Sequence, residues 1–80
     1  MKKMKIPKLS KFLFAPDGEQ KELYIIHTEY PISIIWVKQT IPHQLFIIEQ
    51  EDPNTPDQIM ANILRQAAVW FKANVPFDFN

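Results

Sequence analysis

Apolar residues recur at helical spacing near the C-terminus of the chain, between Thr55 and Asn74. At about 100° per residue, their side chains fall into one sector that covers close to half of the helix circumference. This apolar sector consists of Ile59, Met60, Ile63, Leu64, Ala67, Trp70 and Phe71. A sector this broad is typical of a helix that lies across a sheet, because a seam between two helices needs only a narrow stripe. The pattern therefore predicts a helix over residues 55–74 that packs on a sheet.

Residues suited to capping mark both ends of this predicted helix. Thr55 can accept a hydrogen bond from a free backbone amide, Gln58 completes a capping-box spacing, and Pro56 falls where a missing N–H costs nothing. At the other end, Asn74 can adopt a left-handed conformation, and Pro76 prevents continuation. The helix is thus expected to start at Thr55 and to stop at Asn74.

Short apolar runs rich in isoleucine, valine and aromatic residues precede the helix, and proline-containing spacers separate them. This composition is typical of strands, which we expect at residues 11–15, 21–28, 32–38 and 44–50. The spacers are too short for parallel crossovers, so consecutive strands should be antiparallel neighbours. The predicted fold class is α+β: an antiparallel four-stranded meander (ββββα) with one C-terminal helix packed across one sheet face. Gly18 is expected at a left-handed position of the first turn.

The predicted strands are apolar on both faces. In a sheet with one solvent-exposed face, apolar and polar residues alternate along each strand. One helix covers one face, so the other should expose apolar side chains, each forfeiting about 1.5–3 kcal/mol in water. The residues assigned to this surface or regarded as its aromatic anchors are Tyr24, Ile26, Ile35, Trp36, Val37 and Phe46. Exposed apolar patches usually mark an interface. The cover can be a second copy, a partner protein or the two chain ends; the alternative is a sheet coiled around its own side chains.

The chain has 80 residues and room for one small domain. We divide it into a basic leader expected to be flexible (residues 1–10), the sheet (11–50), the helix (55–74) and a tail (75–80). Prolines and lysines interrupt the N-terminus where a signal peptide needs a continuous apolar stretch, and no uncharged run approaches the about 20 residues that span a bilayer. A cytoplasmic location is expected.

The clearest charge asymmetry lies at the N-terminus, where the first eleven residues carry five lysines and no acidic residue. These lysines are Lys2, Lys3, Lys5, Lys8 and Lys11. Such an arm can lie along phosphates, or it can be a solvated terminus. The net charge of zero and the single arginine, Arg65, argue against a general nucleic-acid footprint.

Few residues in the chain are suited to catalysis. The absence of cysteine excludes thiolate chemistry and cysteine-ligated metals. His27 and Glu29 are two residues apart and could form an acid–base pair on one strand, but no nucleophile has a recognisable setting. His27 and His43 lack metal-motif spacing, and we expect both in exposed strand-end or loop positions. The sequence predicts no enzyme, cofactor or metal site.

Two functions remain from different classes. The first is a small protein–protein interaction or accessory module, a homodimer, that uses an apolar sheet face or edge. The alternative is a nucleic-acid-binding module that uses the lysine arm and sheet aromatics as stacking platforms.

Overall fold

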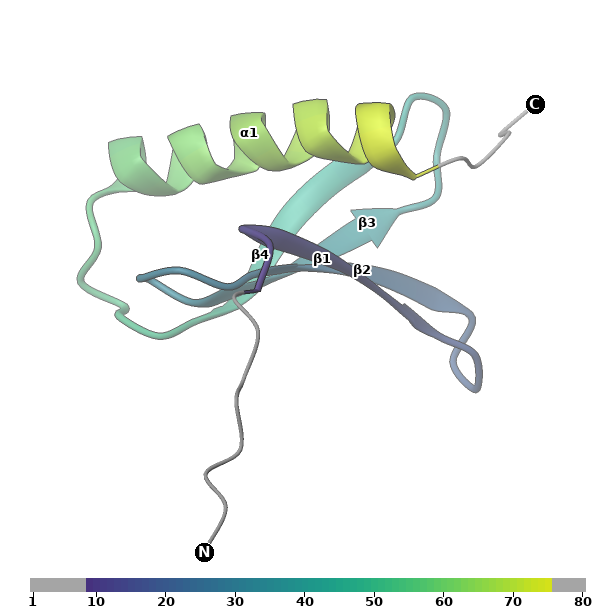
Figure 1. Cartoon of the computed structure of the whole chain (residues 1–80), viewed down its shortest axis with the longest axis horizontal. Helices are drawn as coiled ribbons and strands as arrows, with labels where there is room; N and C mark the ends of the chain where they lie inside the picture. Colours follow the sequence, from purple (N-terminus) through teal and green to yellow (C-terminus); the bar gives the residue numbers. More distant parts are fainter. Residues whose placement is uncertain (1–8, 76–80) are drawn as a thin grey trace, which may run out of the picture.

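A computed structural model describes residues 9–75 of the chain (Figure 1). The elements are β1 (Phe12–Asp17), β2 (Glu22–His27), β3 (Ser33–Lys38), β4 (Gln44–Gln50) and α1 (Asp57–Asn74). The strands form one sheet in the order β1-β2-β3-β4, and every neighbouring pair is antiparallel. The predicted α+β meander with one C-terminal helix is confirmed.

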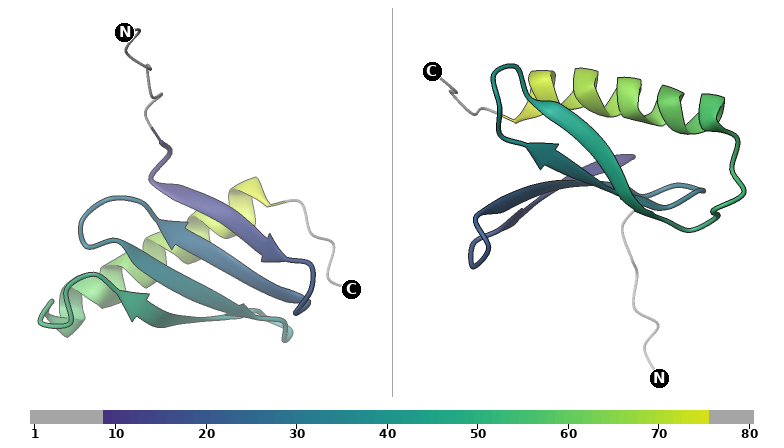
Figure 2. Two further views of the ribbon diagram at one scale, coloured as in Figure 1. Left: turned by 90° about the horizontal axis from the view of Figure 1, so that it is seen from below. Right: turned by 180° about the vertical axis from the view of Figure 1, so that it is seen from behind.

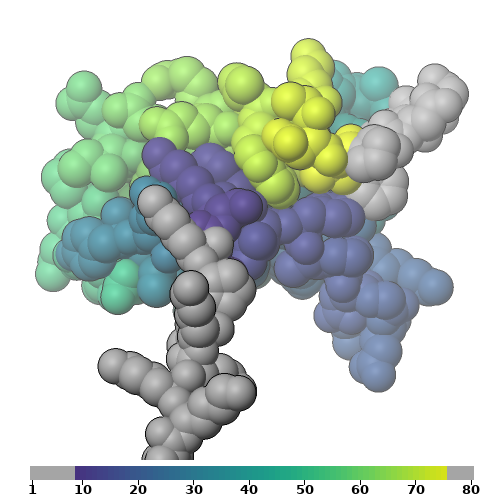
Figure 3. All heavy atoms as spheres, in the orientation of Figure 1, coloured from purple at the N-terminus to yellow at the C-terminus, as the bar shows by residue number. Residues whose placement is uncertain are grey.

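The helix lies on one side of the sheet only. Figure 2 shows α1 running diagonally across one face, and no other helix or strand of residues 9–75 lies on the opposite face. Figure 3 shows the residues of β1 beneath the C-terminal half of α1 and the β1–β2 hairpin projecting beyond the helix. Between β1 and α1, the ring centroids of Phe12 and Trp70 are 5.8 Å apart, and those of Phe14 and Phe71 are 6.0 Å apart.

Side chains from both layers form one core between the sheet and α1. The buried apolar members are Phe12, Leu23, Ile25, Ile35, Val37, Met60, Ile63, Ala67, Phe71 and Val75. The expectation that Ile35 and Val37 lie on the uncovered face is wrong, because both are 0% exposed. The strand register is the reason: it sets Ile35 opposite Ile25 and Val37 opposite Leu23, so these side chains share the helix side.

The N-terminus of α1 differs from the expectation. The helix starts at Asp57, Pro56 occupies the N-cap position, and no side chain caps the helix. The hydroxyl of Thr55 instead donates to the carbonyl oxygen of Asp52 at 2.8 Å. The predicted capping box at Thr55 is therefore wrong, because the hydroxyl is used in the preceding loop.

The C-terminus of α1 is also formed differently. Asn74 stays helical and donates from its Nδ2 to the carbonyl of Trp70 at 2.9 Å, while the extended Val75 ends the helix. Most of the predicted apolar sector faces the sheet, but Ile59 remains 46% exposed. No helix in the described part of the chain combines the length and apolar character needed to cross a membrane.

The first hairpin is longer than predicted, because β1 continues through Pro16 to Asp17. Proline is tolerated here because β1 is an edge strand. The Asp17 Oδ1 accepts the backbone N–H of Glu19 at 3.1 Å and so orders the turn. The left-handed residue is Lys21, with φ of 60°, and not Gly18 as expected.

Candidate interaction surface

The sheet face that α1 leaves uncovered, which we call the open face, is apolar along its centre. Its apolar residues are Leu13, Ala15, Tyr24, Ile26, Ile34, Trp36, Phe46 and Ile48. Of the residues predicted for an interface, the structure brings Tyr24, Ile26, Trp36 and Phe46 together on this face.

Three aromatic residues form a row across neighbouring strands of the open face. Tyr24 on β2 lies opposite Trp36 on β3, and Trp36 lies opposite Phe46 on β4. The rings of Trp36 and Phe46 are 5.7 Å apart and inclined by 31°. The indole Nε1 of Trp36 donates to the Oε2 of Glu22 at 2.5 Å. The centre of the row is thus held in place, and its end at Phe46 is 43% exposed.

A second row on the open face is aliphatic, and the sequence pattern did not single out all of it. Leu13, Ile26 and Ile34 lie opposite one another on β1, β2 and β3. Ile34 could have been assigned from its spacing, because residues two apart on a strand share a face and Trp36 was already identified.

Ile48 lies at an irregularity in the pairing of β3 and β4. Ile34 pairs with Glu49 while Ile35 pairs with Ile47, so Ile48 has no residue opposite it and is 50% exposed. Ile48 could also have been assigned to this face from its spacing, because it lies two residues from Phe46 on the same strand.

Acidic side chains lie at both ends of the open face. Asp17 and Glu22 are opposite each other at the hairpin end, and Glu49 lies toward the other end. Lys38 is the one basic residue among the strand residues on this face. The apolar centre is therefore flanked mainly by negative charge.

Two loops beside this surface are linked by an exposed tyrosine. The phenol of Tyr30 donates a hydrogen bond to the carboxylate of Asp52. This bond lowers the pKa of Asp52, and the backbone N–H of Asn54 adds to the effect at 3.0 Å. The same bond raises the pKa of Tyr30.

His27 is buried, so the expectation of an exposed strand-end histidine is wrong there. The side chain is 2% exposed, its Nδ1–H donates to the carbonyl of Pro31 at 2.9 Å, and its ring lies 5.3 Å from that of Phe12. The Ser33 hydroxyl donates to the same carbonyl at 2.9 Å. Glu29 is exposed beyond the strand end, so the structure does not bring His27 and Glu29 together as an acid–base pair.

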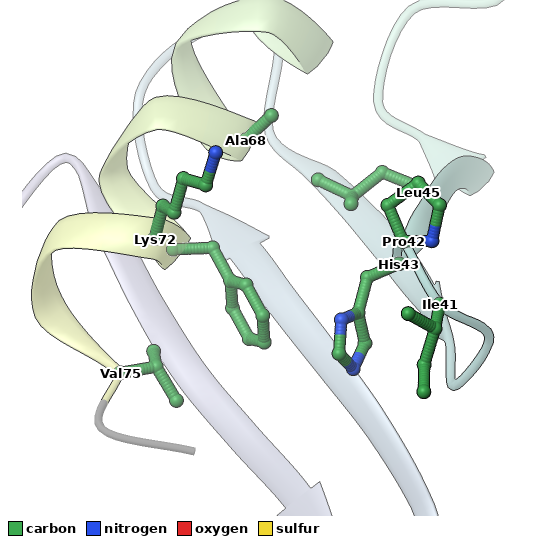
Figure 4. Close-up of a pocket in the computed structure, with 8 residues that line it drawn as sticks. Ile41, Pro42, His43, Leu45, Ala68, Lys72 and Val75 are labelled. Carbon is green, nitrogen blue, oxygen red and sulfur yellow. The ribbon is translucent and has the colours of Figure 1, made fainter. Parts of the chain in front are cut away.

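His43 lines a cavity of about 390 Å³ between the start of β4 and the C-terminal half of α1. Figure 4 shows His43 on one side of it and the helix residues Ala68 and Lys72 on the other. His43 is half-buried, and its ring centroid lies 5.7 Å from that of Phe71. No group of three or more potential metal ligands occurs among residues 9–75.

Most of the lysine arm, namely Lys2, Lys3, Lys5 and Lys8, lies outside the described residues, as does the tail beyond Val75. Lys11 is exposed just before β1, and its Nζ donates to the Oε1 of Gln66 on α1 at 2.6 Å. The described lysine of the arm therefore contacts the helix side of the molecule.

Comparison with known proteins found no matching family model, no matching curated protein and no matching solved structure.

Proposed function

We propose that this chain is a protein-interaction module, acting in the cytoplasm, that presents the open face to a protein partner. The aromatic row of Tyr24, Trp36 and Phe46 carries the proposal. Aromatic residues commonly dominate interface energetics, and exposed apolar patches of this kind usually mark binding surfaces. The hydrogen bond between Trp36 and Glu22 favours binding further, because an ordered side chain loses less entropy when a partner covers it.

The charges around the open face favour a protein partner over a nucleic acid. Asp17, Glu22 and Glu49 would repel phosphates, and Lys38 alone opposes them among the strand residues on that face. A protein partner can place basic side chains against these acidic residues and apolar side chains against the centre of the open face. An apolar centre with a polar border is the usual arrangement of an interface.

Replacing the tyrosine at one end of the aromatic row tests this proposal. Tyr24→Ala should reduce binding of the neutral dye Nile red to the chain, and it should weaken retention of partner proteins from an extract of the native cells. The expected loss of affinity for a partner is about 30-fold, corresponding to a hot spot of about 2 kcal/mol. Tyr30→Ala is the matched control, because Tyr30 is exposed in the loop between β2 and β3 and lies outside the aromatic row.

The comparison of the two tyrosine variants decides the outcome. Loss of dye and partner in Tyr24→Ala, with both retained in Tyr30→Ala, supports the open face as the binding surface. Equal behaviour of the two variants, with circular dichroism showing both folded, removes the open face from consideration.

One observation favours nucleic-acid binding as a second candidate. An aromatic row on an antiparallel sheet can stack successive bases, and the lysines of residues 1–11 can contact phosphates. Titrating the full chain with short single-stranded DNA and RNA at ~50 and ~200 mM salt tests it, because phosphate binding weakens steeply as salt rises. No binding at the lower salt eliminates this candidate.

A further inference from the structure

The outer edge of β4 is the second feature of the sheet that lacks a partner. We infer that a second copy of this chain pairs antiparallel with this edge, so that two four-stranded sheets become one continuous sheet. The inference concerns the edge, and it holds whether or not the open face binds another protein.

The two outer strands differ in their protection against a further strand. β1 contains Pro16 and is preceded by Lys11, and proline and lysine are both devices that keep edges from pairing. β4 has seven residues and contains neither proline nor lysine. Within residues 9–75, no other backbone segment pairs with the outer side of β4. The described part of the chain therefore leaves the backbone groups on that side available to another strand.

The bulge at Ile48 restricts where such pairing can occur. A bulge twists an edge strand, so that another strand cannot pair regularly with it at that point. The part of the β4 edge that remains regular is Gln44–Ile47. A two-fold axis close to Phe46 keeps the pairing within this part. It sets Phe46 opposite Phe46 of the second copy and Leu45 opposite Ile47 of the second copy.

This arrangement is self-complementary, as a two-fold interface requires. Glu49 is the only charged residue of β4, and it lies outside the paired segment, so no like charges are opposed. Pairing also removes part of Phe46, which is 43% exposed, from water.

The consequence is a larger version of the open face. A two-fold axis perpendicular to the sheet places both helices on one side and both open faces on the other. The aromatic row of Tyr24, Trp36 and Phe46 then continues directly into the same row of the second copy. Aromatic pairs directly opposite on neighbouring strands stabilise sheets, which adds a side-chain contribution to the backbone pairing.

Introduced cysteines test the edge directly, since the chain contains none of its own. Phe46→Cys in the full chain should form an intermolecular disulfide, with copper–phenanthroline and oxygen accepting the two electrons of the thiols. Side chains opposite each other near the axis have Cβ atoms about 4.5–5.5 Å apart, and small backbone shifts close the bond. Leu13→Cys is the matched control, because Leu13 is on the same open face but on the opposite edge strand.

Sedimentation equilibrium gives an independent measurement. The full chain should form a dimer, and Phe46→Lys should raise its dissociation constant at least roughly tenfold, because it opposes two like charges at the axis. Leu13→Lys should leave the constant unchanged. Hydrogen exchange of the unmodified chain needs no variant: the amides of Gln44–Ile47 that point away from β3 should exchange more slowly as protein concentration rises.

Two results overturn the inference. One is a monomer at every accessible concentration with unchanged exchange at β4. The other is disulfide formation by Leu13→Cys as efficient as by Phe46→Cys, which indicates stacking of open faces. If the chain is a monomer but Tyr24→Ala still reduces the binding of Nile red, only the edge pairing is contradicted. If the chain is a dimer paired through β4 but Tyr24→Ala changes neither dye binding nor partner binding, only the proposed function of the open face is contradicted.

Discussion

Tyr30 and Asp52 lie in different loops at the same end of the sheet, one between β2 and β3 and the other between β4 and α1. Their side chains share a hydrogen bond, and Asp52 also accepts the backbone N–H of Asn54 at 3.0 Å. Both bonds favour the carboxylate, so the pKa of Asp52 in the folded chain is below its ordinary value. Next to them, the backbone N–H of Ile32 donates to the Oε1 of Glu51 at 2.9 Å. These contacts hold the two loops together.

Removing the phenol of Tyr30 should make the stability of the chain less dependent on pH. A carboxyl whose folded pKa is lowered adds stability above its unfolded pKa, and this contribution is lost as pH falls through the folded pKa. The pKa of Tyr30 is raised, because only the neutral phenol can donate the hydrogen bond to Asp52. The stability that this bond contributes is therefore lost at high pH, as pH rises through the ordinary range of tyrosine and above it. Tyr30→Phe should therefore lower Tm at neutral pH, and the difference from the unmodified chain should vanish at both extremes.

Thermal unfolding across pH measures this difference, and Tyr24→Phe is the control because Tyr24 lies on the open face, away from Asp52. An NMR titration of the Asp52 carboxyl gives the same information directly: its pKa should rise in Tyr30→Phe. A difference in Tm that persists into strong acid would show that the phenol acts through something other than ionised Asp52.

At the scale of elements, the start of α1 depends on the loop that precedes it. The carbonyl oxygen of Asp52 accepts three hydrogen bonds, from the backbone N–H of Thr55 at 3.1 Å, the hydroxyl of Thr55 at 2.8 Å and the Nε2 of Gln50 at 3.1 Å. Thr55 is thus a donor in the loop and does not accept from the first turn of the helix. The loop fixes the direction from which the chain enters α1.

This assignment predicts an unusual preference at position 55. Thr55→Ser keeps the hydroxyl donor and should leave stability nearly unchanged. Thr55→Asp has no donor and should cost about 1 kcal/mol, which lowers Tm by roughly 4–8 °C. The direction of the change in stability separates the two roles of residue 55. If residue 55 capped the helix, aspartate would stabilise the chain as well as threonine does, and its negative charge would also interact favourably with the helix dipole. Thermal melts of the two variants decide, and a Thr55→Asp chain as stable as Thr55→Ser would restore the capping role.

The existence and type of all five elements could be predicted, because strand composition and helical spacing recur over whole segments. The ends could not, because Thr55 and Gly18 each have more than one suitable use. Thr55 can cap a helix or donate within a loop, and the structure uses the second option. Gly18 can adopt a left-handed conformation, but the longer β1 moves that conformation to Lys21.

The candidate surface was predictable only in part for a related reason. Alternation along one strand shows which of its residues share a face, but it does not relate that face to the neighbouring strand. Ile35 and Val37 were therefore assigned to the face of Tyr24, although the register places them opposite Ile25 and Leu23 in the core. The burial of His27 likewise depends on Pro31, whose carbonyl accepts its hydrogen bond.

At the scale of the whole molecule, charge is divided between the described part and the N-terminus. Residues 9–75 carry eight acidic and five basic side chains, because four of the lysines precede residue 9 and Asp78 follows residue 75. Their net charge is −3, whereas residues 1–8 carry four positive charges and the entire chain is neutral. Self-association through β4 and binding of nucleic acid should therefore respond to salt in opposite ways.

Salt should strengthen self-association of a chain that lacks residues 1–8, which has a net charge of −4. Two such copies repel each other, and raising salt from ~20 to ~200 mM shortens the Debye length from about 20 Å to about 7 Å. Sedimentation equilibrium should show a dissociation constant that falls a few-fold over this range, and a smaller change for the neutral full chain. Nucleic-acid binding would weaken steeply over the same range, since it releases counterions from phosphates. A truncated chain that dissociates as salt rises would mean that ion pairs hold the copies together, contrary to an apolar β4 edge.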